Sequence, residues 1–250
     1  MSSRDGTIRI GLMVPSSNTV MEVDLYRRLP GRFQVHTSRM YLETTTPEGE
    51  SEMLDQHAIP AARDIGTARP DVVVFGCTSA GALRGDEYDE ELCGRIAQAS
   101  QSQTMSTIAA VRDAVRRSGA RRIGVITPYV DALNEKIRAS LEADGVEVDA
   151  IHGLGISDNF EIGMVEPDAI IEFAVSCFVG RDIELLFASC TNFRAVDAIG
   201  EMRRAIGVPV TTSNQAVLDA ILHRFGQSWP VSGEPAGEPA TRAAATEAGP

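Results

Sequence analysis

Two short segments of this chain occur twice, and the two copies are the same distance apart in both cases. Arg9–Pro15 (RIGLMVP) resembles residues 122–128 (RIGVITP), and the segment that ends at Cys77 resembles the one that ends at Cys190. Both offsets, 122 − 9 and 190 − 77, equal 113 residues. Two matches at one offset favour a duplicated unit over two generic strand ends. A twofold relation between the copies would place Cys77 opposite Cys190.

Short runs rich in Val, Ile and Leu alternate with longer amphipathic stretches. Unbroken apolar strands between helices are typical of parallel sheets covered on both faces. The sequence therefore predicts an α/β fold of two similar lobes related by a pseudo-twofold axis. Each lobe is expected to be a parallel sheet flanked by helices, with the active site in the cleft between them. The expected strands are 8–14, 33–42, 71–76, 122–126, 146–152, 183–188 and 208–212. The expected helices are 20–29, 50–68 with an interruption near Pro60, 89–99, 106–118, 132–143, 167–179, 195–205 and 216–225.

The chain is expected to return from the second lobe to the first near the C-terminus. Residues 1–100 together with 213–228 are predicted to form the first lobe, and residues 101–212 the second. Residues 229–250 are rich in Pro, Gly, Ala and Glu without periodicity. Such a segment buries too little apolar surface to offset the entropy of ordering, so we expect a disordered tail.

Charge and composition exclude several classes of partner. The formal net charge is −12, which leaves no basic surface for nucleic acid or an anionic membrane. Every apolar run is too short to cross a bilayer. The polar N-terminus leads directly into a strand without a signal peptide, and four scattered cysteines make no disulfide scaffold. We therefore expect a cytoplasmic protein that acts on a small molecule.

Three expected strand ends carry residues suited to chemistry, and ligands of open parallel sheets bind beyond such ends. The first is Pro15–Thr19, where Ser17 and Asn18 either cap the next helix or offer an anion site. The other two begin at Cys77 and Cys190, where a thiolate at a helix start can be stabilised. The small polar residues beside the two cysteines are Thr78, Ser79, Thr191 and Asn192.

A lone cysteine is most often a small buried hydrophobe, but two at related strand ends favour function. Arg194, close behind Cys190, adds a guanidinium suited to a carboxylate. Cys93 and Cys177 lie inside expected helices among apolar residues and are interpreted as packing residues. Cys77 is therefore expected to react with iodoacetamide faster than either of them.

Two further candidates are weaker when taken singly. Tyr129 ends the strand that corresponds to the first strand, so it is expected to project into the same cleft as Asn18. Asn159 lies in a polar segment, residues 158–163, that is expected to be a loop. Taken singly, each segment is more typical of an ordinary turn than of a site.

The sequence lacks the motifs of the common cofactors. The four histidines are widely spaced and the sequence has neither HExxH nor Cys-x-x-Cys, so its pattern does not predict a metal site. There is no GxxxxGK[ST] loop, no complete GxGxxG, no GxSxG elbow and no obvious Schiff-base lysine. No metal and no cofactor are therefore expected.

These residues together resemble the maleate isomerase and arylmalonate decarboxylase family, within the aspartate/glutamate racemase superfamily. The resemblance covers roughly residues 8–225 and rests on the segments 14–19, 36–40 and 127–129, on Asn159 with Gly163, and on the two cysteines. It implies two similar α/β lobes, a cofactor-independent site between them and a homodimer. It also implies catalytic roles for Cys77 and Cys190, and carboxylate binding by Asn18, Tyr129, Asn159 and backbone amides.

The chain departs from maleate isomerases in one respect. Thr78 and Thr191 follow the two cysteines, as in amino-acid racemases and in the ectoine-utilisation subgroup of the family. This departure leaves the identity of the substrate open, but it does not affect the expected two-cysteine chemistry. The decarboxylases typically keep only one of the two cysteines, so the presence of both argues against decarboxylation.

Three functions follow as hypotheses. The first is cis–trans isomerisation of a maleate-like dicarboxylic acid by addition of Cys77 to the double bond. The second is racemisation or epimerisation of an amino-acid-like carboxylate (aspartate, glutamate, a hydantoin or an ectoine-derived amino acid) by two-base proton transfer between Cys77 and Cys190. The third is a non-catalytic protein that binds small acids.

Overall fold

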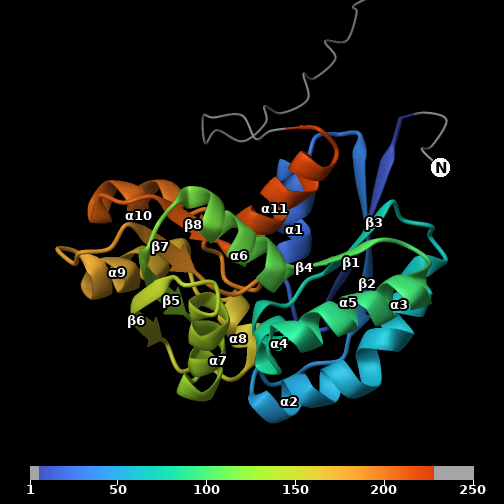
Figure 1. Ribbon diagram of the computed structural model, residues 1–250, viewed down its shortest axis with the longest axis horizontal. Coiled ribbons are helices and arrows are strands. Elements are labelled where there is room, and N and C mark those ends of the chain that lie inside the picture. Colours follow the sequence, from blue (N-terminus) through green and yellow to red (C-terminus); the bar gives the residue numbers. More distant parts are fainter. Residues whose placement is uncertain (1–5, 228–250) are drawn as a thin grey trace, which may run out of the picture.

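Two four-stranded parallel sheets form the framework of the protein (Figure 1). The computed structural model describes residues 6–227, and the α/β fold of two similar lobes is confirmed. The first sheet has the order β2-β1-β3-β4 and the second the order β6-β5-β7-β8. The strands are β1 (Ile8–Pro15), β2 (Phe33–Met40), β3 (Val72–Phe75), β4 (Thr104–Ser106), β5 (Arg122–Thr127), β6 (Glu147–Gly153), β7 (Leu185–Ala188) and β8 (Val210–Thr212).

The repeat in the sequence corresponds to the repeat in the structure. Strand β3 and strand β7 occupy the same place in their sheets, and their bounds differ by 113 residues at both ends, 185 − 72 and 188 − 75. All residues of both strands are buried, as expected for parallel strands covered on both faces. Equivalent strands therefore bring Cys77 and Cys190 to equivalent sheet ends.

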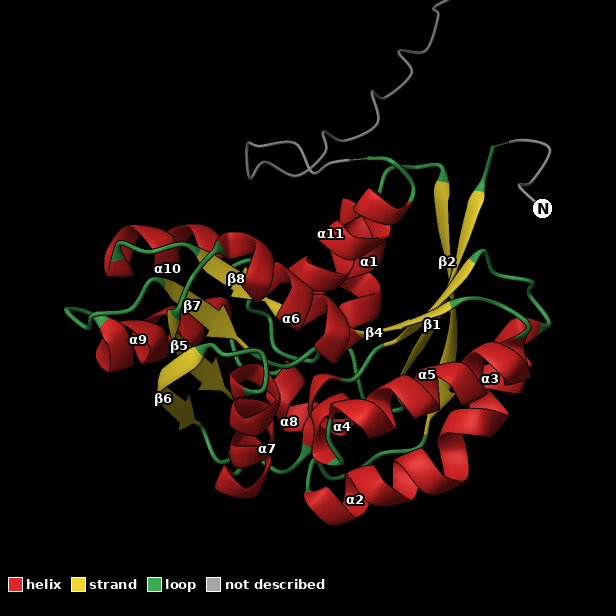
Figure 2. Ribbon diagram, in the orientation of Figure 1, coloured by secondary structure: helices red, strands yellow, loops and turns green. Residues whose placement is uncertain are grey.

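Helices surround both sheets (Figure 2). They are α1 (Met21–Arg28), α2 (Pro47–Glu52), the π-helical turn η1 (Met53–His57), α3 (Ala58–Gly66), α4 (Thr78–Leu83), α5 (Asp86–Ser100), α6 (Thr107–Ser118), α7 (Asp131–Glu142), α8 (Asn159–Gly163), α9 (Pro167–Phe178), α10 (Ile199–Ile206) and α11 (Ser213–Arg224). The expected interruption near Pro60 is the π-helical turn that precedes it. Pro60 has no N–H to donate within the helix, which favours such an irregular turn.

Three local expectations were wrong. The polar segment 158–163 is not a loop but contains helix α8, because Asp158 caps its first turn by accepting from the N–H groups of Phe160 (2.8 Å) and Glu161 (3.2 Å). The helix expected from residue 195 begins only at Ile199, after a series of turns. The helix start expected behind Cys77 is confirmed by helix α4, but the one expected behind Cys190 is wrong, because turns follow that cysteine.

The first sheet extends beyond residue 100, where the first lobe was expected to end. Strand β4 pairs in parallel with β3, so Thr104–Ser106 belong to the first sheet. Its three residues are too few to show a strand period in the sequence. The division into lobes otherwise stays a proposal, and the expected tail 229–250 lies outside the described residues.

The two lobes are joined by helices that follow their last strands. Helix α6 follows β4, helix α11 follows β8, and the two helices pack against each other near the middle of the molecule (Figure 1). Helix α11 also contacts α1, and α4 contacts α7 of the second lobe. Across residues 6–227, none of the helices combines the length and apolarity needed to cross a membrane.

Candidate active site

Cys77 lies at the carboxyl end of β3, where it is the N-cap residue of helix α4. The residue before it must be small, because a Cβ atom on Gly76 would lie 2.8 Å from the carbonyl oxygen of Met13. The close approach of β1 to β3 thus fixes where the chain turns away from the sheet. The Cys77 side chain is only 5% exposed.

Cys190 occupies the equivalent end of β7 and has an unusual backbone. Its φ of +107° lies in a region that L-residues other than glycine rarely adopt. Two hydrogen bonds hold this conformation: the Cys190 N–H donates to Ser213 Oγ (3.0 Å), and the Asn192 N–H donates to Cys190 Sγ (3.3 Å). Backbone strain of this kind is concentrated at functional sites.

Ser213, the first residue of α11, ties the two cysteine segments together. Its Oγ accepts from the Cys190 N–H (3.0 Å) and from Thr78 Oγ1 (2.8 Å), which follows Cys77. The two thiols also influence one another electrostatically. The structure therefore brings both cysteines into one shared interior at the junction of the lobes. Ser213 was not anticipated, because it is 135 residues from Thr78 in sequence.

Tyr129 completes this group from the second lobe. It follows β5, is 1% exposed and lies close enough to Cys190 for each group to influence the pKa of the other. Burial, together with the negative charge that the two thiols can carry, raises its pKa well above the ordinary value for tyrosine. Tyr129 is therefore a neutral hydrogen-bond donor at physiological pH.

Asn18 links the loop after β1 to the Cys190 segment. Its Nδ2 donates to Thr191 Oγ1 (3.0 Å), while its Oδ1 accepts from the N–H groups of Val20 and Met21 (3.1 and 3.0 Å). The expected capping role is confirmed, since Asn18 caps the start of α1, and anion binding by Asn18 stays a prediction. Thr191 Oγ1 in turn donates to the carbonyl oxygen of Gly76 (3.1 Å).

Asn159 connects α8 to the same loops. Its Nδ2 donates to Ser17 Oγ (2.8 Å), and its Oδ1 accepts from Thr45 Oγ1 (3.1 Å). Its carbonyl oxygen accepts from Asn192 Nδ2. Asn18, Ser17, Asn159, Thr191 and Asn192 therefore form one network across the two lobes.

The environment of the thiols differs from the expected one. Burial, followed by the negative charge of Glu50, raises the pKa of Cys77 well above its ordinary value, and burial raises the pKa of Cys190 to about 12. Hydrogen bonds from the backbone N–H groups of Ala80 and Asn192 lower the two values only in part. The expectation of a stabilised thiolate at the helix start was therefore wrong. With its pKa raised by burial, Cys77 is a thiol at neutral pH.

The labelling order is expected to reverse accordingly. Cys93 and Cys177 are half-buried rather than buried, whereas Cys77 is almost inaccessible. We expect iodoacetamide to modify Cys177 at least about tenfold faster than Cys77 in the free protein, because alkylation requires an accessible thiolate. Peptide mass spectrometry after short incubations measures the order, and faster modification of Cys77 would contradict this description of the site.

Glu50 of α2 is a site residue that the sequence did not reveal. It is completely buried, and its Oε1 accepts a hydrogen bond from Ser79 Oγ. Its Oε2 has no hydrogen-bond partner. Burial raises the pKa of Glu50 to about 8. In the sequence it stands between Glu48 and Glu52, in a pattern typical of an exposed helix.

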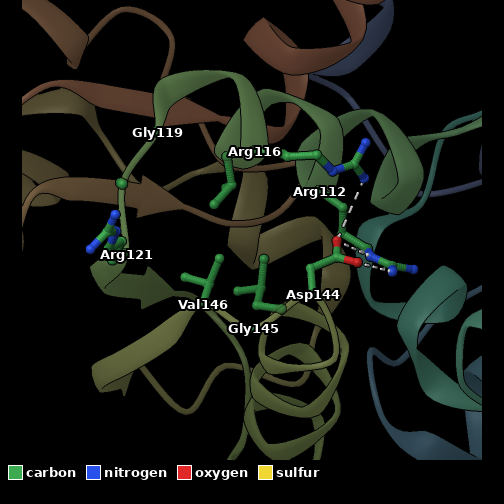
Figure 3. A pocket seen from close by; sticks show the side chains of 10 residues that line it. Arg112, Arg116, Gly119, Arg121, Asp144, Gly145 and Val146 are labelled. Atoms are coloured by element: carbon green, nitrogen blue, oxygen red, sulfur yellow. Dashed lines mark hydrogen bonds and ion pairs between the residues drawn. The ribbon is translucent and has the colours of Figure 1, made fainter.

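Two basic features lie apart from this network. Arg194 forms an ion pair with Glu166 (2.7 Å), so its guanidinium is already engaged by a carboxylate. A surface pocket of about 210 Å³ between α6 and α7 is lined by several arginines, and Figure 3 shows Arg112 and Arg116 directed at Asp144. None of the residues that line this pocket belongs to the cysteine site.

The donor set of the site does not suggest a metal centre. Within the described part of the chain, no group of three or more His, Cys, Asp or Glu side chains is arranged to hold an ion. Apart from the Glu50 carboxyl, the polar groups around the cysteines are hydroxyls, amides and backbone N–H groups, which suit an organic anion.

Comparisons with known proteins agree with this geometry. The model of the arylmalonate decarboxylase family matches residues 10–235. The maleate isomerase of Geobacillus stearothermophilus is 30% identical over 227 residues, which cover 86% of this chain and 90% of the relative.

Two solved structures are similar to this one. A cysteine-to-alanine variant of the maleate isomerase Iso from Pseudomonas putida S16, crystallised with maleate, has a TM-score of 0.83 at 25% identity and covers 88% of this chain and 93% of its own. A cysteine-to-serine variant of the Nocardia farcinica maleate cis-trans isomerase, with a covalently bound succinylcysteine intermediate, has a TM-score of 0.82 at 27% identity and covers 89% and 94%. The chain belongs to the maleate isomerase and arylmalonate decarboxylase family.

Proposed function

We propose that this cysteine-dependent isomerase converts a small maleate-like cis dicarboxylate into its trans isomer, with Cys77 as the nucleophile. The proposal is supported above all by the convergence of the Cys77 and Cys190 segments on Ser213. It is also supported by the similarity to a maleate isomerase that holds a succinylcysteine intermediate. Retention of both cysteines argues against a decarboxylase.

The reaction begins with addition of the Cys77 thiolate to one alkene carbon. A sulfur–carbon bond forms while the π electron pair moves onto the neighbouring carbon and its carboxylate, which gives an enediolate-like intermediate. The former double bond is now single and rotates. The sulfur–carbon bond then breaks, the π bond reforms in the trans geometry, and the thiolate is regenerated. Covalent addition thus replaces one high rotational barrier by lower ones.

The surrounding residues stabilise the charge that builds on the carboxylates. Asn18, Asn159 and the neutral Tyr129 hydroxyl supply side-chain donors, and hydrogen-bond donors fixed in a site that excludes water act strongly. Cys190 lies beside Tyr129 and governs proton transfer to and from the intermediate. The intermediate must not be protonated on carbon before elimination. The further binding groups are Ser17, Thr78, Ser79, Thr191 and Asn192.

Turnover of maleate is the direct test of this function. We expect the purified protein to convert millimolar maleate to fumarate without added metal or cofactor, because the two thiols supply the covalent chemistry. Proton NMR separates the alkene signals of the two acids, and heat-denatured protein is the control. If no fumarate forms at millimolar maleate, the proposed isomerisation of maleate is contradicted.

Racemisation or epimerisation of an amino-acid-like carboxylate is the second candidate function. The placement of one thiol from each lobe in a common interior also suits two-base proton transfer, in which one thiol removes the α-proton and the other returns it. This reaction would introduce solvent deuterium at the α-carbon of aspartate, glutamate, a hydantoin or an ectoine-derived amino acid. In contrast, cis–trans isomerisation through a covalent adduct needs no proton exchange at carbon. The cytoplasmic location and the homodimer remain parts of the proposal.

A further inference from the structure

The Cys77 thiol must lose its proton before it can act as a nucleophile, and the two thiols do not supply a base for that step. Addition to an alkene needs the thiolate, and the Cys77 thiol is buried at 5% exposure. The ionisable groups that act on it most strongly, Glu50 and Cys190, are both acids that can carry negative charge. A nearby base must therefore receive the Cys77 proton, since bulk water does not reach the sulfur freely.

A hydrogen-bonded chain leads from the Cys77 sulfur to such a base. Cys77 Sγ lies 3.9 Å from Ser79 Oγ, within hydrogen-bond distance for sulfur, and Ser79 Oγ donates to Glu50 Oε1. All three side chains are at most 5% exposed. We propose that Glu50 is the base that takes the Cys77 proton through the Ser79 hydroxyl and so generates the nucleophile. This proposal rests on the proposed function of Cys77.

The transfer is balanced within the chain itself. The Cys77 S–H proton passes to Ser79 Oγ while the Ser79 O–H proton passes to Glu50 Oε1. The products are a thiolate, an intact serine hydroxyl and a neutral carboxylic acid. The negative charge thus moves from Glu50 to Cys77 and then, on addition, to the substrate. Return of the proton along the same route restores the resting state.

The surroundings of Glu50 favour this role over a structural one. A buried carboxylate is normally paired with a cation or fully hydrogen-bonded, but Glu50 Oε2 is buried without a partner. Burial raises the pKa of Glu50 to about 8, so the ionised fraction that can accept a proton is the minor one at pH 7 and increases toward pH 8. Such a base suits proton abstraction from a thiol better than an exposed carboxylate does.

The neighbouring titratable groups do not replace Glu50. Asp55 of η1, one turn further along, is engaged by Arg84 at the surface. Tyr129 and Cys190 face Glu50 electrostatically, and its charge raises the pKa of both.

The test compares Glu50→Gln, Ser79→Ala and the double variant with Cys77→Ser and with Glu52→Gln, an exposed control on the same helix. Glutamine has the shape of glutamate, and circular dichroism reports whether each variant folds. At pH 7.5 we expect Glu50→Gln and Ser79→Ala each to lower kcat for maleate by about 10²-fold or more. The double variant is expected to be no worse than the poorer single one, and Glu52→Gln to match the native protein.

The pH profile separates a relay from a merely structural role. The deficit of Glu50→Gln should shrink as the pH rises from 7.5 to 9.5, because the equilibrium fraction of Cys77 thiolate then increases even without Glu50. If Glu50 acts only as a repulsive charge, its removal would favour the thiolate and leave kcat unchanged or raised, which would overturn the proposal. A deficit that does not depend on pH would also overturn it. Activity retained by Cys77→Ser would instead remove the proposed function itself.

Discussion

Replacement of Cys77 by serine is expected to lower kcat for maleate by at least about 10⁴-fold, the scale seen when a catalytic nucleophile is removed. A serine hydroxyl ionises far less readily than a thiol, and the site offers it no stronger base than Glu50. The matched control is Cys177→Ser, since Cys177 is a half-buried cysteine on α9 outside the site. Its kcat should stay within about twofold of the native value.

Steady-state assays by proton NMR, which separates the alkene signals of maleate and fumarate, measure kcat for both variants. Circular dichroism and thermal unfolding must show that Cys77→Ser is folded. A folded Cys77→Ser variant with substantial turnover would show that the sulfur is not the nucleophile. Loss of turnover in Cys177→Ser as well would indicate a general sensitivity to cysteine replacement.

Glu50→Gln is expected to change the pH dependence of stability by an unusually large amount. The pKa of Glu50 rises from an ordinary 4.5 to about 8 on folding. Between these values the folded state binds more protons than the unfolded state, so the free energy of unfolding falls as the pH rises through this window. The full penalty, on the order of 5 kcal/mol, is present above pH 8 and absent below pH 4.5.

Urea unfolding at pH 5, 7 and 9 measures this effect. Glu50→Gln should resemble the native protein near pH 5 and exceed its stability by several kcal/mol at pH 9. Asp24, Asp89 and Asp219 also have raised pKa values, mainly through burial, so the native protein alone does not isolate Glu50. The difference in the free energy of unfolding between the variant and the native protein isolates the contribution of Glu50. A difference that is the same at all three pH values would contradict a buried, unpaired carboxylate at this position.

The large features of the fold could be predicted because they are periodic or repeated. The 113-residue offset between Cys77 and Cys190 is a local match that needs no knowledge of tertiary contacts. It correctly indicated two equivalent sheets and two equivalent strand ends. Strand β4 escaped prediction because three residues carry too little pattern.

The residues that support the two cysteines could not be predicted, because their contacts join distant parts of the chain. Ser213 begins an ordinary helix in the sequence, and only the packing of α11 brings it to Thr78 and Cys190. Glu50 has acidic neighbours two residues away on either side, and no local signal distinguishes the one that points inward. Arg194 shows the opposite case. Its place near Cys190 suggested that it could bind a substrate carboxylate, whereas its guanidinium forms an ion pair with the side chain of Glu166.

The most direct test of the central claim is to trap the adduct on Cys77. In the Cys190→Ser variant, the thiol that controls proton traffic at the intermediate is absent, so addition of Cys77 to maleate should lead to a stable succinyl adduct. Intact mass spectrometry should then show a gain equal to one molecule of maleic acid, and peptide mapping should place it on Cys77 alone. An unmodified protein, or an adduct on Cys93 or Cys177 instead, would contradict Cys77 as the nucleophile of a site shared by two lobes.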